Sequence, residues 1–241
     1  MKKILLSLIA LMVFSSIAMA SPLMDYSQGK GSFDISVRPN MDVDLDFNGQ
    51  VFLPNGERLD GKSSNLDYNL TLGLGKDLAV QFRLFEPATK SHRVTSFPNP
   101  ANNLYDSDKS SYKEFNILHK ISNNVSAFVG YIEGQSTRTR VWTNSAPFSV
   151  RPSETIKQAQ IGLLGSAKLS KELALYGSYA VASGIINAEA GLSHKLSPNT
   201  ELSVSYRYIS FSSLNFPDSI NGDTKVNLTT KGIGYGITCK L

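Results

Sequence analysis

The stretch KGIGYGITCKL, residues 231–241, decides the fold. Its apolar residues occupy every second position, and the positions between them hold small or polar residues. Side chains of a β-strand point alternately to opposite faces, so this stretch is expected to be a strand with one apolar face. The sequence runs to Leu241, so we expect no later element to cover that face. A soluble fold would have to pack other elements over it, whereas a membrane-spanning sheet leaves it against lipid.

The first twenty residues have the pattern of a secretory signal peptide. A short segment with two lysines precedes an almost unbroken apolar run, Ile4–Ile17, and Ala18-Met19-Ala20 then supplies small residues that predict cleavage before Ser21. The run is shorter than the roughly 20 residues that a membrane-spanning helix needs, which disfavours a retained anchor. We therefore interpret residues 1–20 as a cleaved signal peptide and residues 21–241 as a single domain.

Composition limits the class of protein. The formal net charge of +4 falls to +2 when Lys2 and Lys3 are removed with the signal, and no basic block indicates a nucleic-acid partner. The single cysteine, Cys239, excludes an intramolecular disulfide and occupies an apolar position of its strand. Metal-ligand spacings are absent, so neither a metal nor another cofactor is expected. After the signal no apolar stretch is long enough for a membrane helix, so any insertion must use strands.

Alternating rows like the one at residues 231–241 recur along the chain. The first covers residues 33–47, with apolar residues at odd positions, polar residues at even positions and Pro39 at a bend or bulge. Tight polar turns alternate with connections that are mostly long, and the long ones are expected at residues 49–64, 87–110, 134–153 and 212–223. The count gives ten strands, and eight or twelve stay open because a long loop can hide a hairpin.

An even number of strands with short turns at one end and long loops at the other is the arrangement of bacterial outer-membrane barrels. With its signal peptide, hairpin rhythm and terminal strand, the mature chain resembles small Gram-negative outer-membrane β-barrel proteins of the porin-like and surface-antigen kind. The resemblance implies an all-β fold, a single antiparallel transmembrane β-barrel, with short periplasmic turns, long extracellular loops and both termini in the periplasm. It also implies recognition of the C-terminal strand by the barrel-assembly machinery, although such strands usually end in an aromatic residue and this one ends in Leu241.

If the apolar rows face lipid, the polar rows line the lumen. Opposing Leu196 with Thr200 across a tight turn puts Glu189 directly across from Arg207. We therefore predict a belt of charged and amide side chains across the middle of the barrel. Its members are Asp67, Asn69, Arg83, Glu114, Gln158, Gln160, Glu189 and Arg207, and the first strand adds Asp42 and Asp44.

The belt has two interpretations. Barrels of about eight strands are filled by their own side chains, and ten strands add little room, which favours an ion-paired plug and a surface or structural role. Charges enclosed in such a barrel are expected to be paired and hydrogen-bonded. The alternative is a narrow porin-like channel for small polar solutes.

The histidines give little support to catalysis. His119 and His194 share the parity of the apolar rows and precede tight turns, so we expect them on the outer surface near the lipid headgroups. His92 would need nearby serines and aspartates to converge on it. Barrel hydrolases such as omptin proteases or lipid A acyl-modifying enzymes carry acidic pairs or His/Ser motifs at the outer rim, and no matching motif is found. A barrel hydrolase is therefore the less favoured alternative, and the chain is not expected to be an enzyme.

The loop expected at residues 134–153 is the best surface candidate for binding. Arginine and aromatic side chains are what a surface for anions or protein partners uses, and here they lie among Ser, Thr, Asn and Pro. The candidate residues are Arg138, Arg140, Trp142 and Arg151, with Phe148 beside them. The expected partners are outer-membrane lipid and lipopolysaccharide, together with an extracellular ligand at the loops.

Overall fold

The computed structural model describes residues 26–47, 57–60, 65–94, 104–142, 148–150, 153–218 and 222–241. The expected signal peptide and Arg151 lie outside these ranges. The described residues form strands, turns and bends. Among them, no helix is both long enough and apolar enough to cross a membrane.

Within the described ranges, fourteen strands join into one sheet that closes on itself, because β1 pairs with both β4 and β14. The strands are β1 (Gly31–Arg38), β2 (Asp42–Phe47), β3 (Glu57–Asp60), β4 (Asn65–Gly75), β5 (Leu78–Glu86), β6 (His92–Val94), β7 (Leu104–Lys120), β8 (Val125–Trp142), β9 (Phe148–Val150), β10 (Ser153–Lys168), β11 (Leu173–Ala182), β12 (Ile185–Ser197), β13 (Thr200–Asp218) and β14 (Gly222–Lys240).

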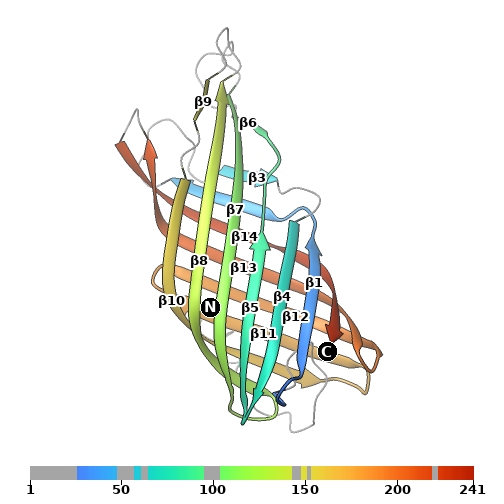
Figure 1. The fold of residues 1–241 in the computed structure, drawn as a ribbon. Coiled ribbons are helices and arrows are strands. Elements are labelled where there is room, and N and C mark those ends of the chain that lie inside the picture. Colours follow the sequence, from blue (N-terminus) through green and yellow to red (C-terminus); the bar gives the residue numbers. More distant parts are fainter. Residues whose placement is uncertain are drawn as a thin grey trace, which may run out of the picture.

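Ten of these strands form the closed wall, namely β1, β4, β5, β7, β8 and β10 to β14 (Figure 1). All their pairings are antiparallel, and each joins neighbours along the chain apart from the β1–β14 seam. The remaining strands extend the wall at the end opposite the tight turns. There β2 pairs with β14 and β3 pairs with β2, while β6 pairs with β7 and β9 pairs with β8. The prediction of a ten-stranded antiparallel barrel is confirmed.

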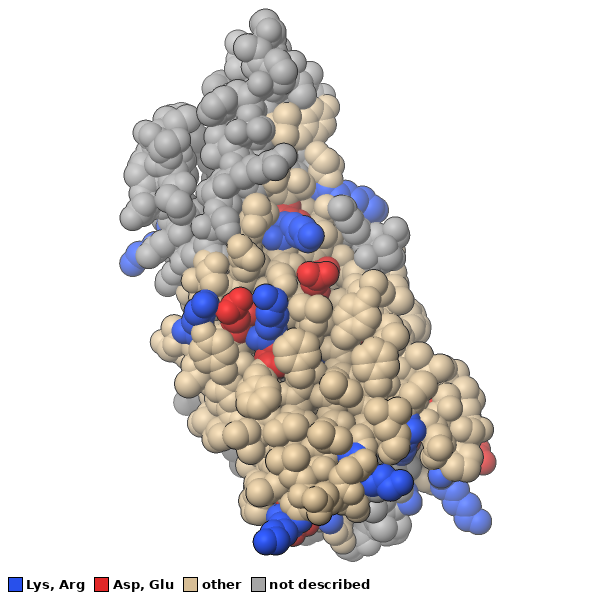
Figure 2. Space-filling model, viewed as in Figure 1, with Lys and Arg blue, Asp and Glu red and all other residues tan. Residues whose placement is uncertain are grey.

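The outer wall is apolar. Many large hydrophobic side chains in the strands' outward rows are 36% to 61% exposed, although such residues usually lie in a protein's interior. Figure 2 shows a broad surface of uncharged residues with lysine, arginine and acidic side chains gathered above and below it. We call this surface the apolar band. A barrel that turns its apolar residues outward and encloses its charges is a transmembrane β-barrel.

Several strands are longer than the sequence pattern predicts. β7 begins at Leu104, β8 continues to Trp142, and β13 and β14 pair through most of the expected loop at residues 212–223. The long loops predicted at residues 49–64, 87–110, 134–153 and 212–223 are therefore partly strand, which is a correction. The alternation disappears there because both faces of these extensions lie beyond the apolar band, so nothing selects apolar residues on one face while the backbone pairing continues.

The first predicted strand, residues 33–47, is broken into β1 and β2. Val37 pairs with Tyr235 and Asp42 pairs with Lys231, so the first chain advances five residues while β14 advances four. Asn40 takes up the extra residue with a left-handed φ of 52°. Such a bulge shifts the register by one residue, and every later side chain changes face.

Candidate functional site: the ionic belt inside the barrel

The interior is layered, and the layers can be read along single strands. From the tight-turn end, the inward residues of β5 are Ala79, Gln81, Arg83 and Phe85. Their neighbours on β7 are, in the same order, Leu118, Asn116, Glu114 and Tyr112. Both strands therefore run from an apolar layer through amides and charges to a second apolar layer.

The apolar layer toward the long-loop end, which we call the outer apolar layer, is aromatic and aliphatic. Tyr112 stacks on Phe211 with ring centroids 4.9 Å apart, and Phe85 lies 5.9 Å from the Tyr112 ring. Eight further inward-facing residues complete or adjoin the layer: Met41, Val43, Ile132, Ile185, Ile209, Leu214, Leu228 and the partly buried Ile156.

The inner apolar layer, toward the tight turns, is smaller. Ala79, Leu118, Phe128, Leu164 and Ala180 form it. Tyr26 packs against it from the segment before β1 and donates a hydrogen bond to Ser126. Burial raises the pKa of the Tyr26 hydroxyl, so the hydroxyl stays protonated and can donate at neutral pH.

Arg207 is at the centre of the belt and is 0% exposed. Its Nη1 lies 3.0 Å from Asp67 Oδ2, and its Nη2 lies 2.6 Å from Glu114 Oε1. Its Nε donates to Asn187 Oδ1 at 3.3 Å, and the guanidinium stacks over the Phe85 ring at 4.9 Å from the centroid. Arg207 therefore joins the ionic belt to the outer apolar layer.

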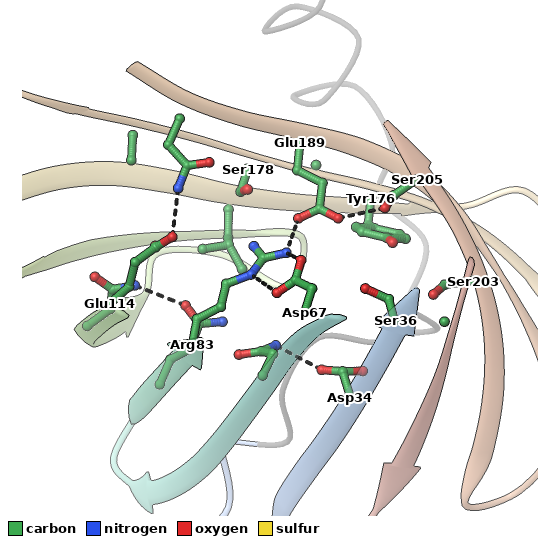
Figure 3. Close-up of a pocket in the computed structure, with 18 of the residues that line it drawn as sticks. Asp34, Ser36, Asp67, Arg83, Glu114, Tyr176, Ser178, Glu189, Ser203 and Ser205 are labelled. Carbon is green, nitrogen blue, oxygen red and sulfur yellow. Dashed lines mark hydrogen bonds and ion pairs between the residues drawn. The ribbon is translucent and has the colours of Figure 1, made fainter. Parts of the chain in front are cut away.

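Two further arginines complete the belt. Arg38 reaches Asp67 at 3.2 Å and Glu189 at 2.6 Å, while Arg83 reaches the same two carboxylates at 2.8 and 2.6 Å. Figure 3 shows the Arg83 guanidinium between Asp67 and Glu189. The three guanidinium groups thus face three carboxylates, those of Asp67, Glu114 and Glu189, and the six residues come from six strands around the wall. Each charge has opposite charges in contact, as buried ions require.

Amide side chains extend the belt through further hydrogen bonds. Asn187 donates to Glu114 at 2.9 Å, and Gln160 donates to Asn116 at 2.8 Å. Asn116 in turn donates to Gln81 at 3.1 Å, which spreads the network across β5, β7 and β10. Asp34 extends it to β1, where its carboxylate accepts from Asn69 at 2.8 Å and from Thr238.

Glycine in the C-terminal strand makes room for the belt. A Cβ at Gly234 would lie 2.8 Å from both Cγ and Nη1 of Arg38, which is closer than side chains tolerate. Position 234 faces inward beside β1, so only hydrogen fits between that backbone and the buried guanidinium. The small residue that marks the polar face of residues 231–241 is thus required by packing.

The structure brings most of the predicted lumen residues together. The fully buried members are Asp67, Glu114, Gln160 and Arg207, and the side chain of Glu189 is almost completely buried. The partly buried members are Arg83, Asn69 and Gln158. Glu189 lies across from Arg207 in register, and Arg83 lies across from Asn69. The ion pairs of Glu189 and Arg207, however, reach other strands across the lumen. Cross-strand counting finds neighbours on one sheet face but not partners across a closed barrel.

Two predicted members of the belt are wrong, and two real members were missed. Asp42 and Asp44 point outward because of the bulge at Asn40, and Asp44 pairs with Lys231 on the outer wall. Arg38 and Asp34 belong to the interior network but were not proposed for it. Their even numbers in the first alternating row were the available signal.

The two histidines expected near the headgroups lie outside the belt. His119 and His194 are exposed on the outer wall. The backbones of Arg138, Arg140 and Trp142 belong to β8 rather than to a loop, and their side chains, like the whole of Arg151, lie outside the described part of the structure.

Two cavities lie on the tight-turn side of Arg207. A cavity of about 70 Å³ adjoins the belt and is lined in part by Asp34, Arg83 and Glu189 (Figure 3). A vestibule of about 600 Å³ opens at the tight turns. Leu164 of the inner apolar layer lines both cavities and stands between them. The smaller cavity has room for a few water molecules, which suits its polar lining.

No family model matches the chain, and no curated protein matches it in sequence. Among solved structures, the outer membrane protease OmpT of Escherichia coli has a TM-score of 0.63 at 12% identity, covering 92% of this chain and 100% of that chain. The translocator domain of the autotransporter NalP from Neisseria meningitidis has a TM-score of 0.46 at 10% identity, covering 88% of each chain. Ail, the attachment invasion locus protein of Yersinia pestis, has a TM-score of 0.40 at 15% identity, covering 87% of this chain and 99% of that chain.

The similarity to OmpT establishes the fold alone. The similarities to NalP and Ail have TM-scores too low to add to it. With the apolar band and the enclosed charges, it assigns the chain to the fold class of Gram-negative outer-membrane β-barrels.

Proposed function

We propose that this protein is a closed, non-conducting outer-membrane barrel with a surface or structural role. The observation that carries the proposal is the filled interior: three guanidinium groups and three carboxylates meet across the lumen, with an apolar layer on either side. A hydrated ion would have to displace both apolar layers and separate buried ion pairs, each step costing several kcal/mol.

The proposal includes a location and an orientation. After removal of the signal peptide, the C-terminal strand engages the barrel-assembly machinery and the barrel inserts into the outer membrane. The tight turns and both termini face the periplasm, and the extensions of β7, β8, β13 and β14 project outside the cell. Projecting strands above a filled barrel suit presentation of a surface, and Arg138, Arg140 and Trp142 of the predicted binding candidate lie on the β8 extension.

A narrow channel is the alternative function. The vestibule and the 70 Å³ cavity are the features that favour it, because together they open part of a path from the tight-turn end to the belt. A hydrolase is less favoured because the two histidines with described side chains, His119 and His194, lie on the outer wall, away from the enclosed carboxylates.

Planar-bilayer recording separates the closed barrel from the channel. We expect no current steps from the wild-type barrel, with an established porin as the control for bilayer sensitivity. The charge-balanced double variant Glu189→Ala with Arg207→Ala is expected to stay silent because both apolar layers persist. Adding Phe85→Ala and Phe128→Ala is expected to produce small steps.

Two results would contradict the proposal. Regular steps from the wild-type barrel would favour the channel. The fourfold variant must first be shown to fold, by a heat-dependent change in gel mobility. If the folded variant then gives no current steps, these side chains are not what blocks the lumen.

A further inference from the structure

A row of three charges crosses the outer wall at one level. Lys113 of β7 pairs in register with Glu133 of β8, which pairs in register with Lys157 of β10. All three side chains face outward, and the lysine side chains are 55% and 59% exposed. The two ammonium groups lie 3.6 and 3.4 Å from opposite oxygens of the Glu133 carboxylate. We call these residues the charged row.

The charged row stands at the edge of the apolar band. The next outward row toward the tight turns is Phe115, Tyr131 and Ala159, and the one after it is Ile117, Val129 and Ile161. Figure 2 shows charged side chains gathering above this uncharged surface.

The height of the band supports this placement. From Lys113 to Ile121 a strand rises about 26 Å along its own axis, or about 20 Å along the membrane normal at a tilt of about 40°. The apolar band of such barrels is about 25 Å tall. The charged row therefore lies at the level where acyl chains give way to headgroups.

The row has the composition of a phosphate site. Two lysines and one glutamate leave a net positive charge, and Glu133 holds both ammonium groups at the wall while their remaining protons stay free to donate. Lys113 on β7 and Lys157 on β10 are separated by one intervening strand, β8. Their Cα atoms are therefore roughly 10 Å apart. Below them, three adjacent strands offer a continuous apolar surface on which several acyl chains can lie side by side.

We infer that Lys113, Glu133 and Lys157 form a binding site for the phosphorylated, multiply acylated glycolipid of the outer leaflet. The lysines bind its phosphate, and the aromatic and aliphatic rows contact its acyl chains. This inference rests on the proposed function for one step only, that the long-loop end of the barrel faces outward. It names the residues of the wall that make the lipid contact.

Binding in non-ionic detergent micelles tests the site. The probes are bis-phosphorylated lipid A, dephosphorylated lipid A and phosphatidylglycerol, with the lipid retained per folded barrel measured by native mass spectrometry. The test variant is Lys113→Gln with Lys157→Gln. The matched control is Lys171→Gln with Lys195→Gln, which removes two exposed lysines from the tight-turn end.

We expect the wild-type barrel to retain bis-phosphorylated lipid A in preference to both other probes. A lysine near an anionic headgroup strengthens binding about fivefold, so the test variant should bind about 30-fold more weakly while the control variant binds as wild type does.

Equal binding of lipid A by the test variant and the wild type would overturn the inference. So would equal retention of phosphatidylglycerol, which would show a general attraction of anionic lipid. The result is independent of conductance: a barrel that conducts but binds lipid A through this row contradicts only the proposed function. A silent barrel that ignores lipid A contradicts only the site.

Discussion

Replacing Arg207 with alanine tests how much the belt contributes to stability. The side chain is 0% exposed and contacts two carboxylates, an amide oxygen and the face of Phe85. Without it, Glu114 keeps only the amide donors of Asn187 at 2.9 Å and Gln160 at 3.3 Å. The belt would then hold one more negative charge than positive charge in a site that water reaches poorly.

Removing one partner of a buried ion pair costs about 3 to 5 kcal/mol, because the other charge is left uncompensated. We therefore expect Arg207→Ala to lower the free energy of unfolding by about 4 kcal/mol. The measurement is urea unfolding of the barrel in lipid vesicles, with the folded fraction read from the heat-dependent gel shift. Lys171→Ala, at an exposed lysine of a tight turn, is the control and should change stability by less than about 0.5 kcal/mol.

A double variant separates the lost charge pair from lost packing. Arg207→Met with Glu114→Gln removes one charge of each sign and keeps most of the volume, so it should cost less than Arg207→Ala by at least about 1 kcal/mol. A loss of under about 1 kcal/mol for Arg207→Ala would show that the belt is hydrated or loosely paired, and our account of the interior would be wrong.

Three further experiments, with five substitutions, test the wall and the seam. Gly234→Val should prevent folding or lower stability by several kcal/mol in the same assay, because its Cβ would overlap the Arg38 guanidinium; wild-type stability would contradict the packing described. Ile161→Arg, two rows into the apolar band, should cost about 2 to 4 kcal/mol, whereas Leu196→Arg beside a tight turn should cost at most about 1 kcal/mol; equal costs would argue against a lipid-facing wall. Asn40→Gly should be nearly neutral and Asn40→Val should cost about 1 to 2 kcal/mol because φ is 52° there; the reverse order would argue against the bulge.

The fold is predictable from sequence because one repeated physical rule governs it. Each membrane-spanning strand must have a row of apolar side chains facing the lipid. The alternation of apolar and polar residues in the sequence identifies that row directly, as at Phe115, Ile117 and Ile121. The same rule places Glu114 and Asn116 inside. Where the wall leaves the apolar band the rule no longer applies, so the extensions of β7 and β8 were predicted as loops.

The belt is less predictable because parity gives the face of a residue but not its height or its partner across the lumen. Arg38 and Glu189 are 151 residues apart and meet only because the closed wall brings β1 and β12 to one level. The inward apolar residues Leu118 and Phe128 are likewise hard to predict, since their immediate neighbours in the same inward row are polar or small. A single bulge at Asn40 then sufficed to misplace Asp42 and Asp44.

Closure of β1 against β14 has a consequence for the order of folding. Arg38 lies on β1, and its acidic partners lie on β4 and β12, so the salt-bridge network is complete only after the first and last strands have met. Contacts of such long sequence separation form late and make folding slow. Until β1 pairs with β14, Glu189 lacks one of its two guanidinium partners. Removing water from its carboxylate would then cost free energy. The barrel's centre therefore acquires its full set of ion pairs only with ring closure, and a chain still open at the β1–β14 seam is expected to be less stable than the closed ring.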